Sequence, residues 1–314
     1  MGKWSLRVPA LVLLAAAALC IAEPAAPADP RPDLRPAARY ARGILWEVRR
    51  PGTAPSHLFG TIHLADPRVL ALPLEVRAAF GASTSFLTEL VVNEAVARRY
   101  YEAAQFEDGR ALAALIGADE YARVSAIMQA RGFPPDLLPR TKPWAVMLNL
   151  ALPAPDTGPM DRGVVLDQQL YLLARVQNKA VGELDQIEEQ IFLFDEMPME
   201  AQIALLRNAL ANYHRLGDAT ERAIAAWVRR DLAALWRISQ EGATDAANAA
   251  EFAPHQALFN RRILFDRNLV MAYRMQPALR RGRAFVAVGA LHLYGEQGVL
   301  KLLADQGYRL RRVY

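Results

Sequence analysis

The sequence predicts an α/β protein with a central mixed β-sheet, built from two similar halves that a large helical insert separates. Short β-rich runs that end in Gly-x-x-His occur near both ends of the chain, at residues 60–63 and 289–292. Between them, in residues 93–260, apolar side chains recur at three- and four-residue steps, which is the spacing of amphipathic helices. The outer parts are therefore expected to form the sheet and the middle part a helical layer.

The N-terminus has the pattern of a secretory signal peptide over residues 1–22. Lys3 and Arg7 precede an apolar run at residues 8–21, and small residues follow near Ala22. This run is short for a membrane-spanning helix, so we expect export to the periplasm or secretion, with no stable membrane anchor after cleavage. Residues 23–39 are rich in Pro and Ala and predict a flexible lead-in. Residues 40–314 are then expected to form a single domain.

Composition excludes several classes of protein. Of 314 residues, 53% are hydrophobic and 22% charged, which is typical of a globular chain rather than a disordered one. The net charge is +4 and the arginines are spread along the chain, so a solvated surface is favoured over nucleic-acid binding. Cys20 is the only cysteine. If it leaves with the signal peptide, disulfides, thiolate zinc sites and a cysteine nucleophile are all excluded.

The first elements after the lead-in predict a hairpin and a helix. Residues 44–49 and 57–62 read as strands on either side of a Pro51-Gly52 turn. A helix is expected next, from about residue 72 to residue 80.

A third strand is predicted at residues 85–92, and it contains Glu89. A buried carboxylate in such an apolar run is costly unless a cation or a metal ion compensates it. The alternative is that Glu89 faces solvent on an edge strand.

The insert reads as a series of helices, at residues 111–130, from residue 142, at 164–176 and at 186–240. The helix at 164–176 carries Asp167 at an otherwise apolar start. Breaks are expected in the long region near Pro198 and Gly217. A short strand at 180–185 ends in an acid, Asp185.

The last third of the chain is expected to return to the sheet. Residues 242–253 read as a linker of small residues, and a helix follows at 261–275. That helix carries Asp266, Arg267 and Asn268, which by default form a polar rung on its surface. A strand at 285–288, the second Gly-x-x-His, a helix at 297–304 and a strand at 308–313 then repeat the order of the first half.

Two histidines stand out because they share one context. His63 and His292 each follow a predicted strand, and sites in open α/β sheets form at the carboxyl ends of strands. A lone histidine after a strand is most often structural, but the repetition favours a function for this pair. His57, His214 and His255 lack that context and are read as structural or surface residues.

These motifs resemble those of the TraB/GumN family, which includes the TIKI proteases, over residues 40–314. The pair of Gly-x-x-His motifs is the family hallmark, and supporting matches lie at Lys142-Pro143-Trp144, Glu189-Gln190, Arg267-Asn268 and residues 286–308. Asp185 and Asp266 depart from the pattern, because the family usually has Glu at both positions. The resemblance implies a fold similar to erythromycin-esterase and ChaN-like proteins and, through the TIKI members, divalent-metal-dependent proteolysis.

The first hypothesis is therefore a metal-dependent hydrolase of a peptide or small molecule. His63 and His292 would bind a divalent ion, Zn, Mn or Co, with Glu89 as third ligand or as catalytic base. Arg267 would hold the carbonyl oxygen or a substrate carboxylate.

Three further polar residues are assigned supporting positions behind the ligands. They are Asp185, Asp266 and Asn268. Asp185 or Asp266 would orient a histidine through the ring nitrogen that does not face the metal.

Two other hypotheses remain open. The histidines could bind a ligand such as haem, as the similarity to ChaN-like proteins permits, or the protein could be an accessory factor in envelope polysaccharide export. Both histidines could instead be structural. No Gly-rich phosphate motif follows a strand and no Gly-x-Ser-x-Gly is present, so a nucleotide site and a serine hydrolase are not supported.

Overall fold

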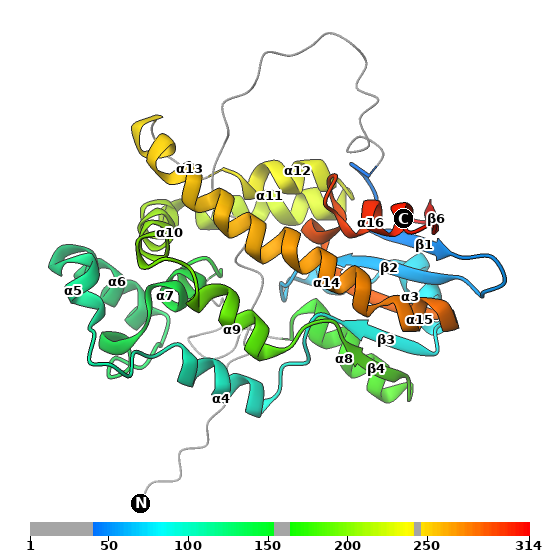
Figure 1. Cartoon of the computed structure of the whole chain (residues 1–314), viewed down its shortest axis with the longest axis horizontal. Helices are drawn as coiled ribbons and strands as arrows, with labels where there is room; N and C mark the ends of the chain where they lie inside the picture. Colours follow the sequence, from blue (N-terminus) through cyan, green and yellow to red (C-terminus); the bar gives the residue numbers. More distant parts are fainter. Residues whose placement is uncertain (1–39, 154–163, 242–245) are drawn as a thin grey trace, which may run out of the picture.

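A computed structural model describes residues 40–153, 164–241 and 246–314 (Figure 1). It contains a six-stranded sheet in the order β4-β3-β5-β2-β1-β6. The strands are β1 (Leu45–Arg49), β2 (Ser56–Thr61), β3 (Ser85–Thr88), β4 (Ala180–Glu183), β5 (Ala284–Gly289) and β6 (Arg309–Arg312). Neighbours from β4 to β2 pair in parallel, and β1 pairs antiparallel with β2 and β6. The predicted α/β fold with a mixed sheet and a helical insert is confirmed.

Strand β5 occupies the centre of the sheet because its sequence is apolar on both faces. All six residues of Ala-Phe-Val-Ala-Val-Gly are buried. A continuous apolar run of this kind is typical of a parallel strand that is covered on both sides. Strand β5 pairs with β2 and β3, so segments from distant parts of the chain end side by side.

Helices make up most of the rest of the described chain. The α-helices are α2 (Pro67–Leu70), α3 (Leu74–Gly81), α4 (Glu94–Ala103), α5 (Leu112–Ile116), α6 (Ala118–Ala130), α7 (Pro143–Leu150), α8 (Leu166–Val176), α9 (Ile187–Asp195), α10 (Met199–Asn212), α11 (Leu216–Val228), α12 (Leu232–Ser239), α13 (Ala246–Asn260), α14 (Arg267–Arg274), α15 (Gln276–Arg281) and α16 (Val299–Asp305). Shorter turns are η2 (Leu138–Arg140), η3 (Tyr213–Arg215) and η5 (Ala290–Leu293), and η4 (Arg261–Asp266) is a π-helix. No helix of the described residues is long and apolar enough to cross a membrane.

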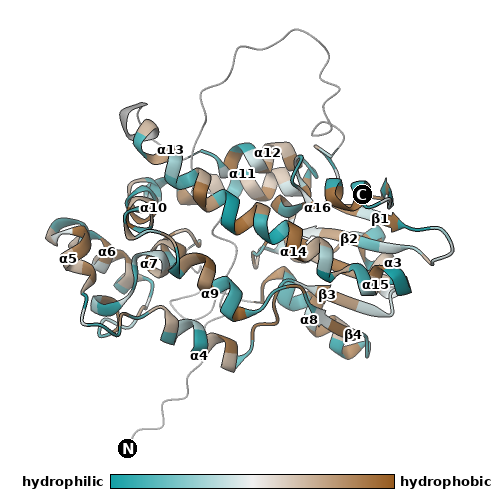
Figure 2. Ribbon diagram, in the orientation of Figure 1, coloured by the Kyte–Doolittle hydropathy of each residue, from teal (hydrophilic) through white to brown (hydrophobic). Residues whose placement is uncertain are grey.

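The buried hydrophobic residues form two separate cores. One packs the sheet against helices such as α3, α8 and α15, and the other lies within the helical insert. The run from α13 through η4 and α14 to α15 extends from the insert to the sheet (Figure 1). Apolar and polar residues alternate along α9 and α14, as expected of amphipathic helices (Figure 2).

The Lys-Pro-Trp motif at the start of α7 belongs to the core of the insert. Trp144 is fully buried and stacks on Phe194 with 5.4 Å between ring centroids. The indole nitrogen and the Lys142 ammonium both donate to the carboxylate of Asp195. This motif therefore ties α7 to α9 and lies away from the two histidines.

Three sequence predictions need correction or lie outside the structure. Residues 246–253 are not a linker but the first half of α13, because Ala-rich sequence favours helix and Phe252 and Phe259 anchor it in the insert core. Gly217 lies inside α11, and the break comes earlier, at η3. The predicted signal peptide and lead-in, and residues 242–245 of the predicted linker, lie outside the described residues.

Close approach of the backbone explains the glycine of the first Gly-x-x-His motif. A Cβ atom at Gly60 would lie 2.7 Å from Leu293 Cδ1 and 3.0 Å from Ala290 Cα. Gly60 thus lets η5, which carries the second histidine, pack directly against β2. The Trp227 indole donates to the Gly60 carbonyl oxygen over 2.9 Å and covers the same contact.

We therefore expect Gly60→Ala to destabilise the fold by about 1–3 kcal/mol, the usual cost of overpacking a tight core. Gly217→Ala is the matched control, because nothing lies within 4 Å of the added methyl group and the residue is helical. It should be neutral or stabilise by up to about 1 kcal/mol. Chemical denaturation of both variants would measure this, and equal stability of the two would contradict the packing argument.

Candidate functional site

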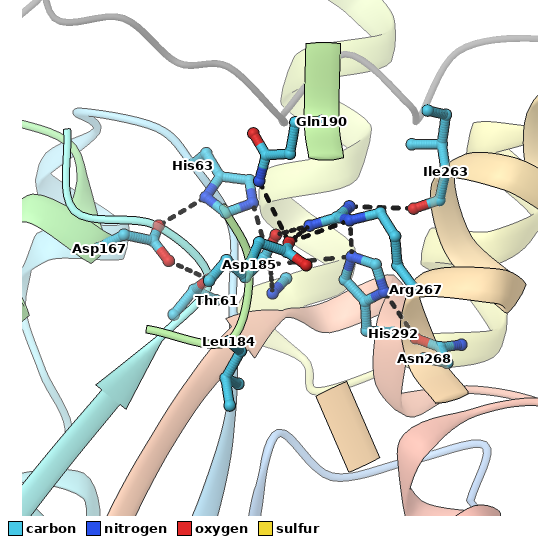
Figure 3. A network of polar contacts seen from close by, with 12 residues as sticks. Thr61, His63, Asp167, Leu184, Asp185, Gln190, Ile263, Arg267, Asn268 and His292 are labelled. Carbon is cyan, nitrogen blue, oxygen red and sulfur yellow. Dashed lines mark hydrogen bonds and ion pairs between the residues drawn. The ribbon is translucent and has the colours of Figure 1, made fainter. Parts of the chain in front are cut away.

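The two predicted histidines lie together at the carboxyl edge of the sheet. Strands β2 and β5 pair in parallel with Thr61 opposite Gly289, so both Gly-x-x-His motifs leave the sheet at the same level. His63 and His292 line one pocket. Figure 3 shows their rings pointing toward a shared group of charged side chains.

His63 is oriented by an acid from the helical insert. Its Nδ1 lies 2.7 Å from Oδ2 of Asp167, in the first turn of α8, and the Thr61 hydroxyl donates to the other carboxylate oxygen over 2.7 Å. Because a carboxylate only accepts, Nδ1 carries the hydrogen and Nε2 faces the pocket. Burial disfavours the charged ring, but the nearby Asp167 and Glu89 carboxylates outweigh it and raise the pKa of His63 to about 9.

His292 has a different hydrogen-bond partner from His63, and its pKa is lowered rather than raised. Its Nδ1 lies 2.7 Å from Oδ1 of Asn268, whose amide nitrogen donates to the Gln297 carbonyl oxygen over 2.8 Å. The second bond fixes the amide orientation, so Nδ1 of His292 donates and Nε2 keeps its lone pair. Burial is the main reason that the pKa of His292 falls to about 3, so the ring is neutral.

Glu89 lies between the two rings, just after the end of β3. It is 3% exposed, which excludes the alternative of a solvent-facing side chain. Its Oε1 accepts the Gly289 backbone N–H over 2.6 Å and lies 3.9 Å from Nε2 of His63 and 3.8 Å from Nε2 of His292. Burial opposes its charge, but Arg267, together with the protonated His63 and the Gly289 N–H, lowers the pKa of Glu89 to about 2. The carboxylate is therefore ionised.

Arg267 supplies the buried positive charge. Its Nη2 donates to Glu89 Oε2 over 2.5 Å, and its Nε and Nη2 both donate to Asp185 Oδ2. Its Nη1 donates to the Ile263 carbonyl oxygen at 3.0 Å and lies 3.3 Å from Nε2 of His292. Ile263 belongs to the π-helix η4, where the altered backbone pairing lets a side chain reach a carbonyl.

The structure brings six of the seven predicted site residues together and places the seventh elsewhere. Asp185 contacts Arg267 and accepts from Gln190, and contacts neither ring. Asp266 is exposed and lies 3.9 Å from Arg261. The position predicted for these acids, behind the histidines, is occupied by Asp167 and Asn268.

Arg267 and Asn268 are both buried, so the default reading of a surface rung is corrected. Asp167 was not identified from the sequence as a site residue. Its signal was an acid at the apolar start of a helix, and nothing local connects that position to His63, which is 104 residues away.

Gly289 is required by the site itself. A Cβ atom there would lie 3.1 Å from Nε2 of His63, 3.3 Å from Oε1 of Glu89 and 3.4 Å from Cδ2 of His292. The glycine of the second motif thus leaves the space that the three functional side chains share.

A metal ion must be tested against this donor set. Among residues 40–153, 164–241 and 246–314, no group of three His, Cys, Asp or Glu side chains is arranged as a metal site. The chemistry nevertheless fits a divalent ion, because two imidazole Nε2 atoms and one carboxylate oxygen face one space. Donors in a tetrahedral zinc site lie roughly 3.3 Å apart, so both Nε2 atoms would have to approach Oε1 from their present 3.9 and 3.8 Å. Binding also requires that Nη1 of Arg267 leave His292 and that His63 lose its proton.

Comparison with known proteins identifies the family of this chain. A model of the TraB/PrgY/gumN family matches residues 44–312. The chain belongs to this family. The match covers the sheet, the insert and both Gly-x-x-His motifs, so the resemblance drawn from the sequence is confirmed.

Relatives in the family differ in how much is known of them. The chain is 25% identical to "Uncharacterized protein YbaP" of Escherichia coli (strain K12), over 82% of this chain and 90% of that protein. It is 26% identical to "Metalloprotease TIKI2" of Danio rerio, over 85% of this chain and 60% of that protein, and 24% identical to the Xenopus tropicalis protein of the same name. No solved structure matches the chain.

The metal-free protein should lose stability as the pH rises. The folded-state pKa of His63, about 9, lies above its ordinary value of 6.5, so the folded state holds the proton more tightly. This stabilisation is fully present below pH 6.5 and is lost as the pH rises to about 9, with a slope of at most about 1.4 kcal/mol per pH unit. Denaturant unfolding at several pH values measures it. Asp167→Asn should flatten the slope, and an unchanged slope would contradict the assigned pair.

Removing the positive charge of Arg267 should lower the stability of the fold strongly. Arg267→Met leaves Glu89 and Asp185 buried without their cation, and we expect a loss of about 3–5 kcal/mol. Arg274→Met, on the same helix, is the control, because its pair with Glu189 is partly exposed and contributes at most about 1 kcal/mol. Equal losses of stability in the two variants would contradict the central place given to Arg267.

Proposed function

We propose that this protein is an exported hydrolase of peptide bonds whose site is the cluster of His63, His292, Glu89 and Arg267, working with a divalent metal ion. The observation that carries the proposal is the convergence of two oriented imidazole Nε2 atoms on one ionised carboxylate, at the end of a pocket. The similarity to proteins named metalloproteases supports it. Export rests on the predicted signal peptide at residues 1–22.

Each residue of the cluster would have its own role in binding the ion or in orienting a ligand. Nε2 of His63, Nε2 of His292 and Oε1 of Glu89 would hold the ion, and Asp167 and Asn268 keep both rings in the required orientation. Such an ion lowers the pKa of a bound water molecule and polarises a carbonyl group. A carboxyl group with a pKa near 2 is a poor proton acceptor near neutral pH. We therefore assign Glu89 as a ligand rather than as the general base.

Arg267 has two tasks in this scheme. Its Nε and Nη2 hold Asp185 and Glu89, which keeps the carboxylate ionised and in place. Its Nη1 has a weak contact of 3.3 Å with Nε2 of His292. If that nitrogen held the ion, the Nη1 hydrogen that faces it would be available to a substrate oxygen, while Nη1 keeps its bond to the Ile263 carbonyl oxygen.

Metal content tests the proposal directly. The wild-type protein without a His-tag should bind about one equivalent of Zn, Mn or Co, as expected of a single site. His63→Ala and His292→Ala should each lose it, because each removes one of two nitrogen ligands. His214→Ala is the control, since His214 is exposed and its Nδ1 contacts the Ala211 carbonyl oxygen three residues earlier.

Elemental analysis by mass spectrometry, after loading and desalting, gives the answer. Equal metal content in wild type and both histidine variants would refute the assignment. A Soret band after haem is added and the excess removed, lost in the same variants, would instead support a haem-binding protein.

A further inference from the structure

The pocket that ends at the two histidines is apolar along its walls. Helix α11 contributes Ala219 and Ala223, and α12 contributes Leu235 and Ile238. Further apolar walls come from the segments that follow β2, α7 and β5 and from η4. The site thus continues into a cavity that two helices of the insert form against the sheet edge.

Away from the two histidines, the described lining of this pocket carries no charged side chain. Its only side chains with polar groups are Thr61, His63, Thr220 and His292. The Thr61 hydroxyl already donates to Asp167. A charged group placed against α11 and α12 would lose its hydration without gaining a counter-ion there, which is costly. An apolar group would gain the free energy of leaving water.

The pocket and the cluster of His63, His292, Glu89 and Arg267 share residues. A group bound in the pocket therefore lies next to a group bound at the cluster. His63, His292 and Gly289 line the pocket, and the same three surround Oε1 of Glu89. A substrate whose carbonyl group lies at the Nε2 atoms therefore places the adjoining side chain against α11 and α12.

We propose that this pocket is a specificity pocket for an uncharged aliphatic or aromatic side chain next to the scissile peptide bond. The inference deepens the hydrolase proposal and rests on it. The substrate class is accordingly a peptide with a residue such as Leu, Met or Phe at that position, with Lys, Arg, Asp and Glu disfavoured.

Binding of matched peptides tests the pocket without requiring turnover. Three blocked pentapeptides would differ only in the central residue, Leu, Lys or Glu, and calorimetry on the full mature chain would give their dissociation constants with and without added Zn. The Leu peptide should bind at least about tenfold more tightly than either charged peptide, as expected for burying one Leu side chain.

Variants on α11 test whether the preference for the Leu peptide arises from this pocket. Ala223→Phe fills it and should weaken binding of the Leu peptide about tenfold or more, toward the level of the charged peptides. Val228→Phe adds the same bulk on the outward side of α11, where Val228 is 42% exposed, and should leave binding unchanged. Ala223→Asp, at a half-buried position, should move the preference from the Leu to the Lys peptide.

Equal affinity of wild type for the three peptides, no detectable binding, or unchanged binding in both Ala223 variants would overturn the specificity pocket. The same peptides, assayed for cleavage, separate the two proposals. Preferred binding of the Leu peptide with no cleavage of any peptide would support the pocket and count against the hydrolase. Cleavage of all three at equal rates would support the hydrolase and overturn the pocket.

Discussion

The buried ionic contact of Arg267 with Glu89 and Asp185 is the constraint on which the site depends. It joins the end of β3, the turn after β4 and the start of α14, three segments that are distant in the chain. Each of these charges would be unfavourable alone in the interior, so their positions are mutually determined. Because Glu89 also accepts the Gly289 N–H, the network fixes the end of β5 as well.

The two histidines are similar in sequence context but differ in chemistry. Asp167 beside His63 raises the pKa of that ring, whereas neutral Asn268 beside the buried His292 leaves the ring uncharged. One imidazole is thus ready to bind a cation, and the other must first release a proton. Both tautomers expose Nε2 to the same space, which is the arrangement that a shared ligand requires.

The helical insert contributes more than a cover for the sheet. Helix α8 supplies Asp167, and α11 and α12 supply the apolar wall beside the histidines. Most buried residues of these three helices belong to the core of the sheet, whereas α7, α9 and α10 pack in the separate core around Trp144 and Phe194. The polar chemistry therefore comes chiefly from strand ends and α14, and the proposed selectivity from the insert.

By itself the sequence determined the strands, the mixed sheet and the pairing of His63 with His292, because apolar runs and Gly-x-x-His motifs are local patterns. It also singled out Glu89 and Arg267, through the cost of burying a carboxylate and through family motifs. Tertiary structure alone decided that Asp167 rather than Asp266 stands by a histidine, because that contact joins residues 104 positions apart. The Ala-rich residues 246–253 favour helix locally, but the packing of Phe252 and Phe259 that holds this helix in the insert core lies beyond any local pattern.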